Sequence, residues 1–466
     1  MKQKLLLKAL PVGFAVLGGL AILFWWRGGS SRPLMERVPG LDQVAGAVAT
    51  NGGNATWEGK LIPSSAAPPT GFNGVWPWFR GPDLNGISTE NVPLARSWPS
   101  SGPPVLWKLD VGEGFAAAAV WKGRVYIIDY DHKGQADALR CLSLADGQEL
   151  WRYTYPLKVK RYHGMSRTIP AVTGKYVVSL GPKCQVVCCD ASTGELRWKM
   201  NLVREFNATV PEWYAGQCPL IDGDRVVLAP GGDALIITVD LETGKVLWKS
   251  PNPRQAVMTH SSITPVKFKD QRLYVYCANN GVYGIAADDG RILWDTGSWT
   301  VKNANVPAPV SVGDGRIFLS GGYDAGSMMI QLKESEGKLA VETQFKLKPN
   351  VFGSAQQTPI LFQEHLLGVR PDGQLVCLDL KGKNTWESGG SNKFGLGPYM
   401  IAQGLILAMN DDGLLTLAEA TTAGFKKLAQ AKVLNGPDAW GPMALADGRL
   451  ILRDMNQMVC LDVAAK

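Results

Sequence analysis

Histidine is scarce in this sequence, with four residues in a chain of 466. Two of them, His132 and His365, have no partner at the spacing of a metal site, and the cysteines form no C-x-x-C pattern. The sequence also lacks a P-loop, a dinucleotide-binding fingerprint and a nucleophile elbow. We therefore predict no metal site, and no motif identifies a catalytic residue.

Net charge is also small once the N-terminus is set aside. The chain carries a formal charge of +7, and its first 32 residues contain five basic residues and no acidic one. The remainder is close to neutral, so charge gives no reason to expect a nucleic-acid partner.

One long apolar run is present, from Ala9 to Trp26, and it follows a basic tail over residues 1–8. It is just long enough to span a bilayer, and its bulky aromatic end favours an uncleaved signal anchor over a cleaved signal peptide. No cysteine follows it that would carry a lipid. Basic residues before the span predict a single-pass protein of the bacterial inner membrane, whose remaining chain faces the periplasm.

Residues 27–75 are rich in Ala, Gly, Pro and Ser and show little apolar periodicity. This composition predicts a flexible linker that holds a domain away from the membrane. We expect the next stretch, residues 76–103, to pack on that domain as a lead-in segment.

A repeated phrase organises the rest of the chain. Its clearest copies are DASTGELRWKM and DLETGKVLWKS, in which a glycine is followed four residues later by a tryptophan. The glycine supplies the positive φ of a hairpin turn, and the tryptophan is expected to pack between neighbouring units. The pairs are Gly147 and Trp151, Gly194 and Trp198, Gly244 and Trp248, Gly290 and Trp294, and Gly382 and Trp386.

Each unit of about 45 residues contains four strand-like segments, which is typical of a propeller blade. The last unit ends at residue 466 without its fourth strand, whereas residues 104–111 form an orphan strand that carries Trp107. Supplying this strand to the last unit would close the ring and remove its open edge. We predict an all-β, eight-bladed propeller over residues 104–466, closed by an N-terminal strand.

This arrangement resembles the PQQ-type propeller repeat, named after pyrroloquinoline quinone. The resemblance rests on the D-x-x-T-G-x-x-x-W phrase and on an apolar strand that opens each blade. The family includes quinoprotein alcohol dehydrogenases and, without a cofactor, the outer-membrane assembly scaffold BamB. The repeat specifies the fold but not the activity.

The adjacent residues Cys188 and Cys189 are a possible redox pair, because the quinoprotein dehydrogenases carry a disulfide between adjacent cysteines beside the quinone. Their register favours a structural role, since Cys377 and Cys460 occupy the slot of Cys188 in other units. Neighbouring residues on a strand also face opposite sides, so a bond between them would distort the strand.

Loops that join consecutive blades are expected to meet at one mouth of the channel and to form a binding funnel for a ligand or partner. Its candidate residues are His163, Arg167, Trp213, Tyr214, His260, Asn303, Asn305, Gln356, Gln357 and Trp440.

A quinone enzyme would need a calcium cage and a base carboxylate, but these loops offer only Glu212 and Asp438. We therefore expect no cofactor and a membrane-anchored, BamB-like scaffold that binds protein partners in the cell envelope. The alternative is a PQQ-dependent dehydrogenase that uses PQQ with calcium. A sensor or carbohydrate-binding module is a third hypothesis.

Overall fold

The computed structural model describes residues 17–20, 22–23 and 57–465. Residues 17–20 and 22–23 are helical, whereas the basic tail and most of the predicted membrane span 9–26 lie outside the described residues. No described helix is long and apolar enough to cross a bilayer. The chain divides into two compact units, residues 1–38 and 39–466, and the second contains the propeller.

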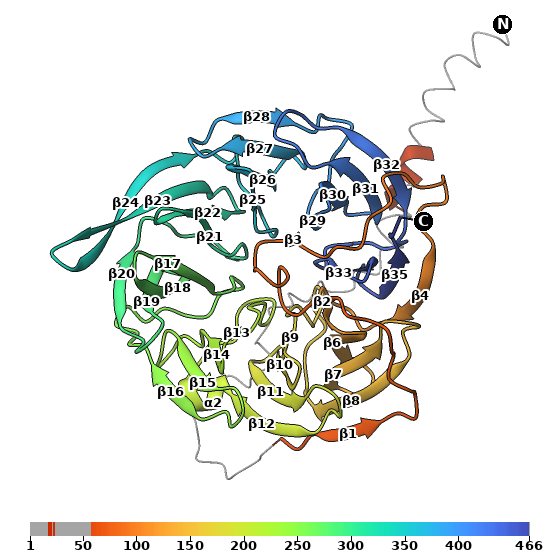
Figure 1. The fold of residues 1–466 in the computed structure, drawn as a ribbon, viewed down its shortest axis with the longest axis horizontal. Coiled ribbons are helices and arrows are strands. Elements are labelled where there is room, and N and C mark those ends of the chain that lie inside the picture. The colour runs from red at the N-terminus through yellow and green to blue at the C-terminus, as the bar shows by residue number, and fades with distance from the viewer. Residues whose placement is uncertain (1–16, 21, 24–56, 466) are drawn as a thin grey trace, which may run out of the picture. The chain divides into compact units, whose positions relative to one another are not determined.

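Eight antiparallel sheets form a ring of blades (Figure 1), and each has four strands from its own blade, as predicted. Blades 1 to 4 comprise β5 (Ala119–Trp121), β6 (Arg124–Asp131), β7 (Ala136–Ser143) and β8 (Glu149–Pro156); β9 (Ala171–Val172), β10 (Tyr176–Leu180), β11 (Gln185–Asp190) and β12 (Leu196–Asn201); β13 (Leu220–Asp222), β14 (Arg225–Leu228), β15 (Ile237–Asp240) and β16 (Val246–Lys249); and β17 (Thr264–Phe268), β18 (Gln271–Ala278), β19 (Gly281–Ala286) and β20 (Ile292–Thr296). A short helix, α2 (Leu202–Phe206), follows β12.

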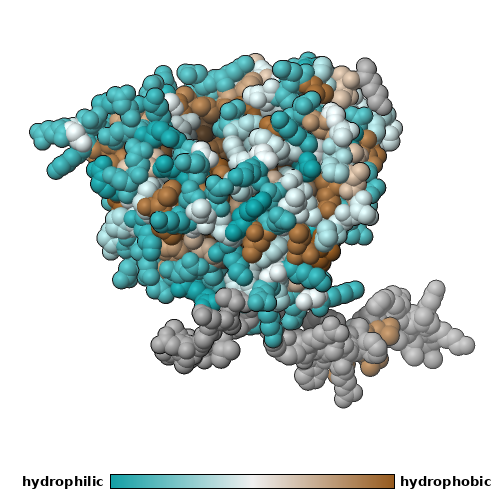
Figure 2. Space-filling model, turned by 60° about the horizontal axis from the view of Figure 1, so that its bottom comes forward, coloured by the Kyte–Doolittle hydropathy of each residue, from teal (hydrophilic) through white to brown (hydrophobic). Residues whose placement is uncertain are grey.

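Blades 5 to 8 comprise β21 (Val310–Gly313), β22 (Arg316–Gly321), β23 (Gly326–Ser335) and β24 (Lys338–Leu347); β25 (Ile360–Phe362), β26 (His365–Val369), β27 (Leu375–Asp379) and β28 (Asn384–Glu387); β29 (Tyr399–Ala402), β30 (Leu405–Met409), β31 (Leu414–Glu419) and β32 (Lys427–Lys432); and β33 (Ala444–Ala446), β34 (Arg449–Arg453), β35 (Gln457–Asp462) and β4 (Val105–Asp110). The long hairpin formed by β23 and β24 projects from the ring (Figure 1). Its end is hydrophilic (Figure 2). Central strands such as β10 are buried along their whole length, because neighbouring blades cover both faces.

The ring closes as the sequence predicts. Strand β4, from the N-terminal side, pairs antiparallel with β35 and places Trp107 opposite Cys460. The eighth blade is therefore built from both ends of the propeller, and closure leaves no unpaired edge between the first and last blades.

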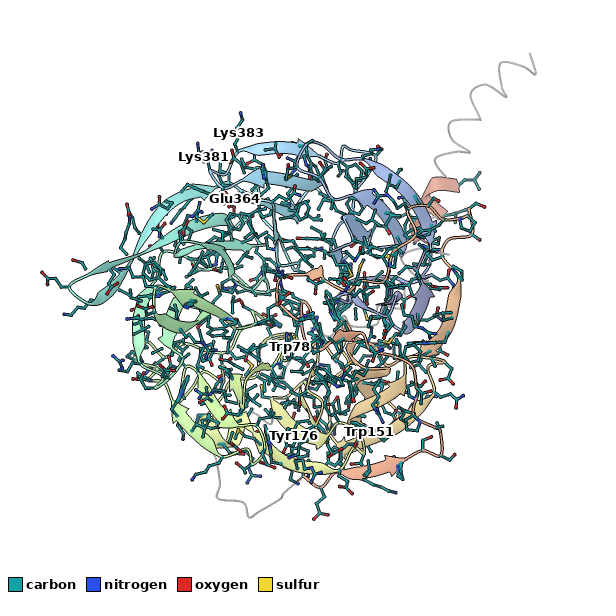
Figure 3. All side chains as sticks on the ribbon, viewed as in Figure 1. Trp78, Trp151, Tyr176, Glu364, Lys381 and Lys383 are labelled. Carbon is teal, nitrogen blue, oxygen red and sulfur yellow. The ribbon has the colours of Figure 1, made fainter. Side chains whose placement is uncertain are left out.

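In several blades the repeated tryptophan contacts the turn of the next blade. The indole N–H of Trp198 donates to the Leu241 carbonyl of blade 3 at 2.8 Å, and that of Trp107 donates to the Leu144 carbonyl of blade 1 at 3.0 Å. The indole N–H of Trp151 donates in the same way to the Ala191 carbonyl of blade 2. Trp151 lies near the rim of the ring (Figure 3). The indole ring of Trp198 lies so close to the turn of blade 3 that a Cβ added to Gly244 would be 2.6 Å from it.

Three short strands extend these sheets. Strand β1 (Lys60–Pro63) adds to the outer edge of blade 1 beside β8, although it falls within the predicted linker, residues 27–75. Strands β2 (Val75–Trp76) and β3 (Ile87–Ser88) add to the innermost strands of blades 1 and 7, respectively. The lead-in segment therefore enters the centre of the ring.

Replacement of Gly244 by alanine should destabilise the propeller more than replacement of Gly337. Both glycines have a positive φ, of 71° and 74°, but a Cβ on Gly337 would meet no atom within 4 Å. Gly337→Ala should cost about 1 kcal/mol of unfolding free energy, and Gly244→Ala roughly 2–4 kcal/mol because its Cβ also meets an indole. Chemical denaturation measures both values, and equal losses would contradict the blade-to-blade contact.

A buried acid in blade 1 predicts a pH dependence of stability. The Asp137 side chain is buried, accepts a hydrogen bond from Tyr155 Oη at 2.5 Å, and burial raises its pKa from 3.8 to about 7. Between these values the folded state holds the proton more strongly than the unfolded state, so the free energy of unfolding falls as pH rises from about 4 to 7.

Asp137→Asn should remove this pH-dependent loss of unfolding free energy, which is on the order of 4 kcal/mol. Its melting temperature should fall less between pH 5 and 7.5 than that of the unmodified chain. Asp270→Asn, at an exposed turn, is the matched control and should behave like the unmodified chain. Parallel pH profiles for all three proteins would show that Asp137 does not carry the effect.

Candidate functional site

The lead-in segment closes one end of the central channel. The Pro77 carbonyl accepts from Val172 N–H of blade 2, and three residues later Arg80 donates to the Thr358 and Pro359 carbonyls of blade 6. Because blades 2 and 6 lie on opposite sides of an eight-membered ring, the segment crosses the channel, as Figure 1 shows near β2 and β3. Trp78 of this segment accordingly lies nearer the centre than Trp151 (Figure 3).

Hydrogen bonds from Arg80 hold the crossing segment in place. Its guanidinium donates to four backbone carbonyls, those of Leu84, Asn85, Thr358 and Pro359, at 2.8–3.0 Å. Burial lowers its pKa to about 10, so the side chain remains charged at neutral pH. Its donors are directed at the protein itself, and we assign it a structural role.

Above the crossing lies a cavity of about 380 Å³, and the loops that join consecutive blades form its walls. Its floor includes Trp76, Phe79 and Arg80 of the lead-in segment. Seven predicted funnel residues line it, namely His163, Arg167, Trp213, His260, Gln356, Gln357 and Trp440.

The other three predicted funnel residues do not line the cavity. Tyr214 is fully buried and donates through its hydroxyl to the Lys160 carbonyl. Asn303 is exposed, and Asn305 is buried with neither side-chain polar atom hydrogen-bonded to a described residue. Phe79, Arg80, Phe115, Tyr323 and Tyr399 line the cavity but were missing from the predicted set.

Arg167 connects two loops at the cavity wall. Its Nε donates to the Trp213 carbonyl at 2.5 Å, its Nη2 donates to the His163 carbonyl, and its guanidinium lies 5.1 Å from the centre of the Phe115 ring. Burial lowers the pKa of Arg167 to about 10. The adjacent Trp213 and Tyr214 have φ values of 61° and 72°, which bulky residues rarely adopt. Arg167 thus supports a strained turn as well as placing a cation beside the cavity.

Aromatic rings surround this cation. Phe115 stacks on Trp440 with ring centres 5.1 Å apart, and His163 meets the Trp440 edge at 5.2 Å. Two carboxylates near Trp440 are engaged at the rim, because Asp411 accepts from Trp440 Nε1 at 2.7 Å and Asp438 lies 3.6 Å from His163 Nε2.

His260 faces the cavity as a neutral acceptor. Only 8% of the residue is exposed, and burial together with the charge of Arg167 lowers its pKa to about 4. Its Nε2 has no hydrogen-bond partner among the described residues. Buried polar atoms are usually paired, so this unpaired nitrogen is the polar atom of the cavity wall that most needs a partner.

Sequence comparison decides the family. Residues 134–388, more than half of the chain, match the family described as outer membrane protein assembly factor BamB. The chain belongs to this family. No curated protein matches the sequence.

Three solved structures are similar to this BamB-family chain. BamB from Moraxella catarrhalis and the computationally designed protein Ika8 each have a TM-score of 0.52 and 14% identity, over 77% of this chain and 99% and 100% of theirs. A europium-containing methanol dehydrogenase has a TM-score of 0.46 and 13% identity, over 81% of this chain and 89% of its own. At these identities the likeness to the first two structures concerns the fold and assigns no chemistry.

The cavity of this BamB-family chain does not fit a calcium–quinone group. No Asp or Glu lines the cavity, whereas calcium requires several oxygen ligands and the quinone chemistry requires a base. No cluster of His, Cys, Asp and Glu among the described residues could hold a metal ion. A cation placed here would meet Arg80 and Arg167 instead of carboxylates.

The cysteine pair also lies away from the cavity. Cys188 and Cys189 are on β11, the third strand of blade 2, and both are buried with free thiols. Cys188 pairs with Val178 and Trp198 across the sheet, and its Sγ lies 3.7 Å from the Leu241 carbonyl of blade 3. Burial raises the pKa of the Cys188 thiol to about 12, which disfavours the reactive thiolate.

A titration of the full-length chain with PQQ and calcium should show no calcium-dependent change in quinone absorbance and no dye-linked alcohol oxidation. The reason is the lack of carboxylates around the cavity. A quinoprotein dehydrogenase reconstituted in parallel provides the positive control. Calcium-dependent binding with turnover would contradict this reading of the cavity.

Proposed function

We propose that this propeller is a membrane-anchored, non-enzymatic scaffold that assists the assembly of outer-membrane proteins from the periplasmic side. The family match over residues 134–388 carries this proposal. In the proposed topology residues 9–26 cross the inner membrane as a signal anchor, and the propeller lies in the periplasm.

The structure supports a binding role in two ways. The ring is closed by β4, and its channel is crossed by the lead-in segment, so the loops are held on a rigid support. The turn between β22 and β23 lines the same cavity and exposes an aromatic group, Tyr323, of which 47% is accessible. Aromatic side chains on a rigid surface are common anchors of protein interfaces. We place the partner contact on this loop face.

Deletion of the gene should lower the abundance of outer-membrane β-barrel proteins, because their assembly would lose a supporting component. Quantitative proteomics of separated membranes measures this effect, and inner-membrane proteins serve as the internal control. Unchanged β-barrel levels in the deletion strain would rule out the assembly role.

Complementation then tests the loop face. Tyr323→Glu should fail to restore β-barrel levels, because it places a charge in the proposed contact. Leu247→Glu is a matched control, since Leu247 is also 47% exposed but lies on the outer strand β16. Equal rescue by the two variants, at equal protein levels, would place the contact elsewhere.

A further inference from the structure

The Arg167 guanidinium is a cation without a counter-ion among the described residues. Its hydrogen bonds use Nε and Nη2 and go to the backbone carbonyls of Trp213, His163 and Gly164, and no described residue accepts from Nη1. None of the ion pairs among the described residues includes it. A half-buried guanidinium without an ion-pair partner is expected to bind an anion, which can accept charge-assisted hydrogen bonds from it.

His260 supplies a second polar group in the same part of the cavity. Its ring centre lies 6.4 Å from that of Trp213, whose carbonyl Arg167 holds. The carbonyls of Glu212 and Tyr214 face the imidazole and favour a proton on the ring nitrogen directed at them. With the ring proton on Nδ1, the unpartnered Nε2 is an acceptor that a donor in the cavity would satisfy.

The remaining wall limits the charge and polarity of an occupant. Phe79, Phe115, Trp440 and Met443 contribute apolar surface, and the lining contains no acid. Arg80 is the other cation in the lining, but it already donates to four carbonyls. One anionic group is thus accommodated, and the volume of about 380 Å³ suits a small molecule.

We propose that the cavity binds a small apolar carboxylate that carries an N–H or O–H donor next to its carboxylate group. The carboxylate accepts from Arg167 Nη1, the neighbouring donor bonds to His260 Nε2, and the apolar part lies among the aromatic rings of Phe115 and Trp440. This ligand site shares Tyr323 with the proposed protein contact, but binding of a small molecule to the purified chain tests it separately from the scaffold role.

Calorimetric titration of the purified full-length chain with three related probes tests the chemistry without altering the protein. N-acetyl-L-phenylalanine has both the carboxylate and the N–H, its amide lacks the charge, and 3-phenylpropionate lacks the N–H. The acid should bind at least tenfold more tightly than its amide and severalfold more tightly than 3-phenylpropionate. Equal affinities for the acid and the amide, or no binding of the acid at millimolar concentration, would overturn the proposal.

Variants test the two assigned residues. Arg167→Met should abolish the preference for the acid over the amide, whereas Arg161→Gln, which removes an exposed arginine paired with Glu113, should retain it. His260→Phe should equalise N-acetyl-L-phenylalanine and 3-phenylpropionate. Thermal unfolding of each variant verifies the fold, and a folded Arg167→Met protein that still prefers the acid would overturn the assignment.

Discussion

The contact between a tryptophan and the turn of the next blade is the constraint on which this structure depends. Four of these rings, those of Trp107, Trp151, Trp198 and Trp248, lie against a glycine that cannot gain a Cβ without a clash. Three of the four indoles also donate to a carbonyl at the start of the same turn. Because Trp107 makes this contact between blade 8 and blade 1, the ring closes with the same interaction that builds it. The spacing of the blades then fixes the width of the channel.

The channel becomes a cavity only because the lead-in segment crosses it. Strand β2 pairs with blade 1 and strand β3 with blade 7. Hydrogen bonds of Pro77 to blade 2 and of Arg80 to blade 6 hold the crossing in place between opposite sides of the ring. The result is an aromatic chamber with Arg167 and His260 in its wall and no carboxylate. This charge distribution is opposite to the one that a calcium–quinone group requires.

The sequence predicts the ring well because its repeat is periodic. The glycine-to-tryptophan offset marks the turns, and the orphan strand around Trp107 implies closure. The cavity is less predictable. Strands β2 and β3 have two residues each and show no periodicity, so nothing signals that Arg80 crosses the channel. Likewise, loop position alone does not reveal that Tyr214 points into the core while its neighbour Trp213 lines the cavity.

A rigid ring with an exposed loop face is consistent with a scaffold whose partners bind at one end. The most direct test of this account is photo-crosslinking in living cells from a reactive amino acid placed at position 323 or, as the control, at position 247. The account predicts that position 323 crosslinks to a component of the outer-membrane protein assembly machinery and that position 247 does not. Identical crosslinking patterns from the two positions, or none from position 323, would contradict it.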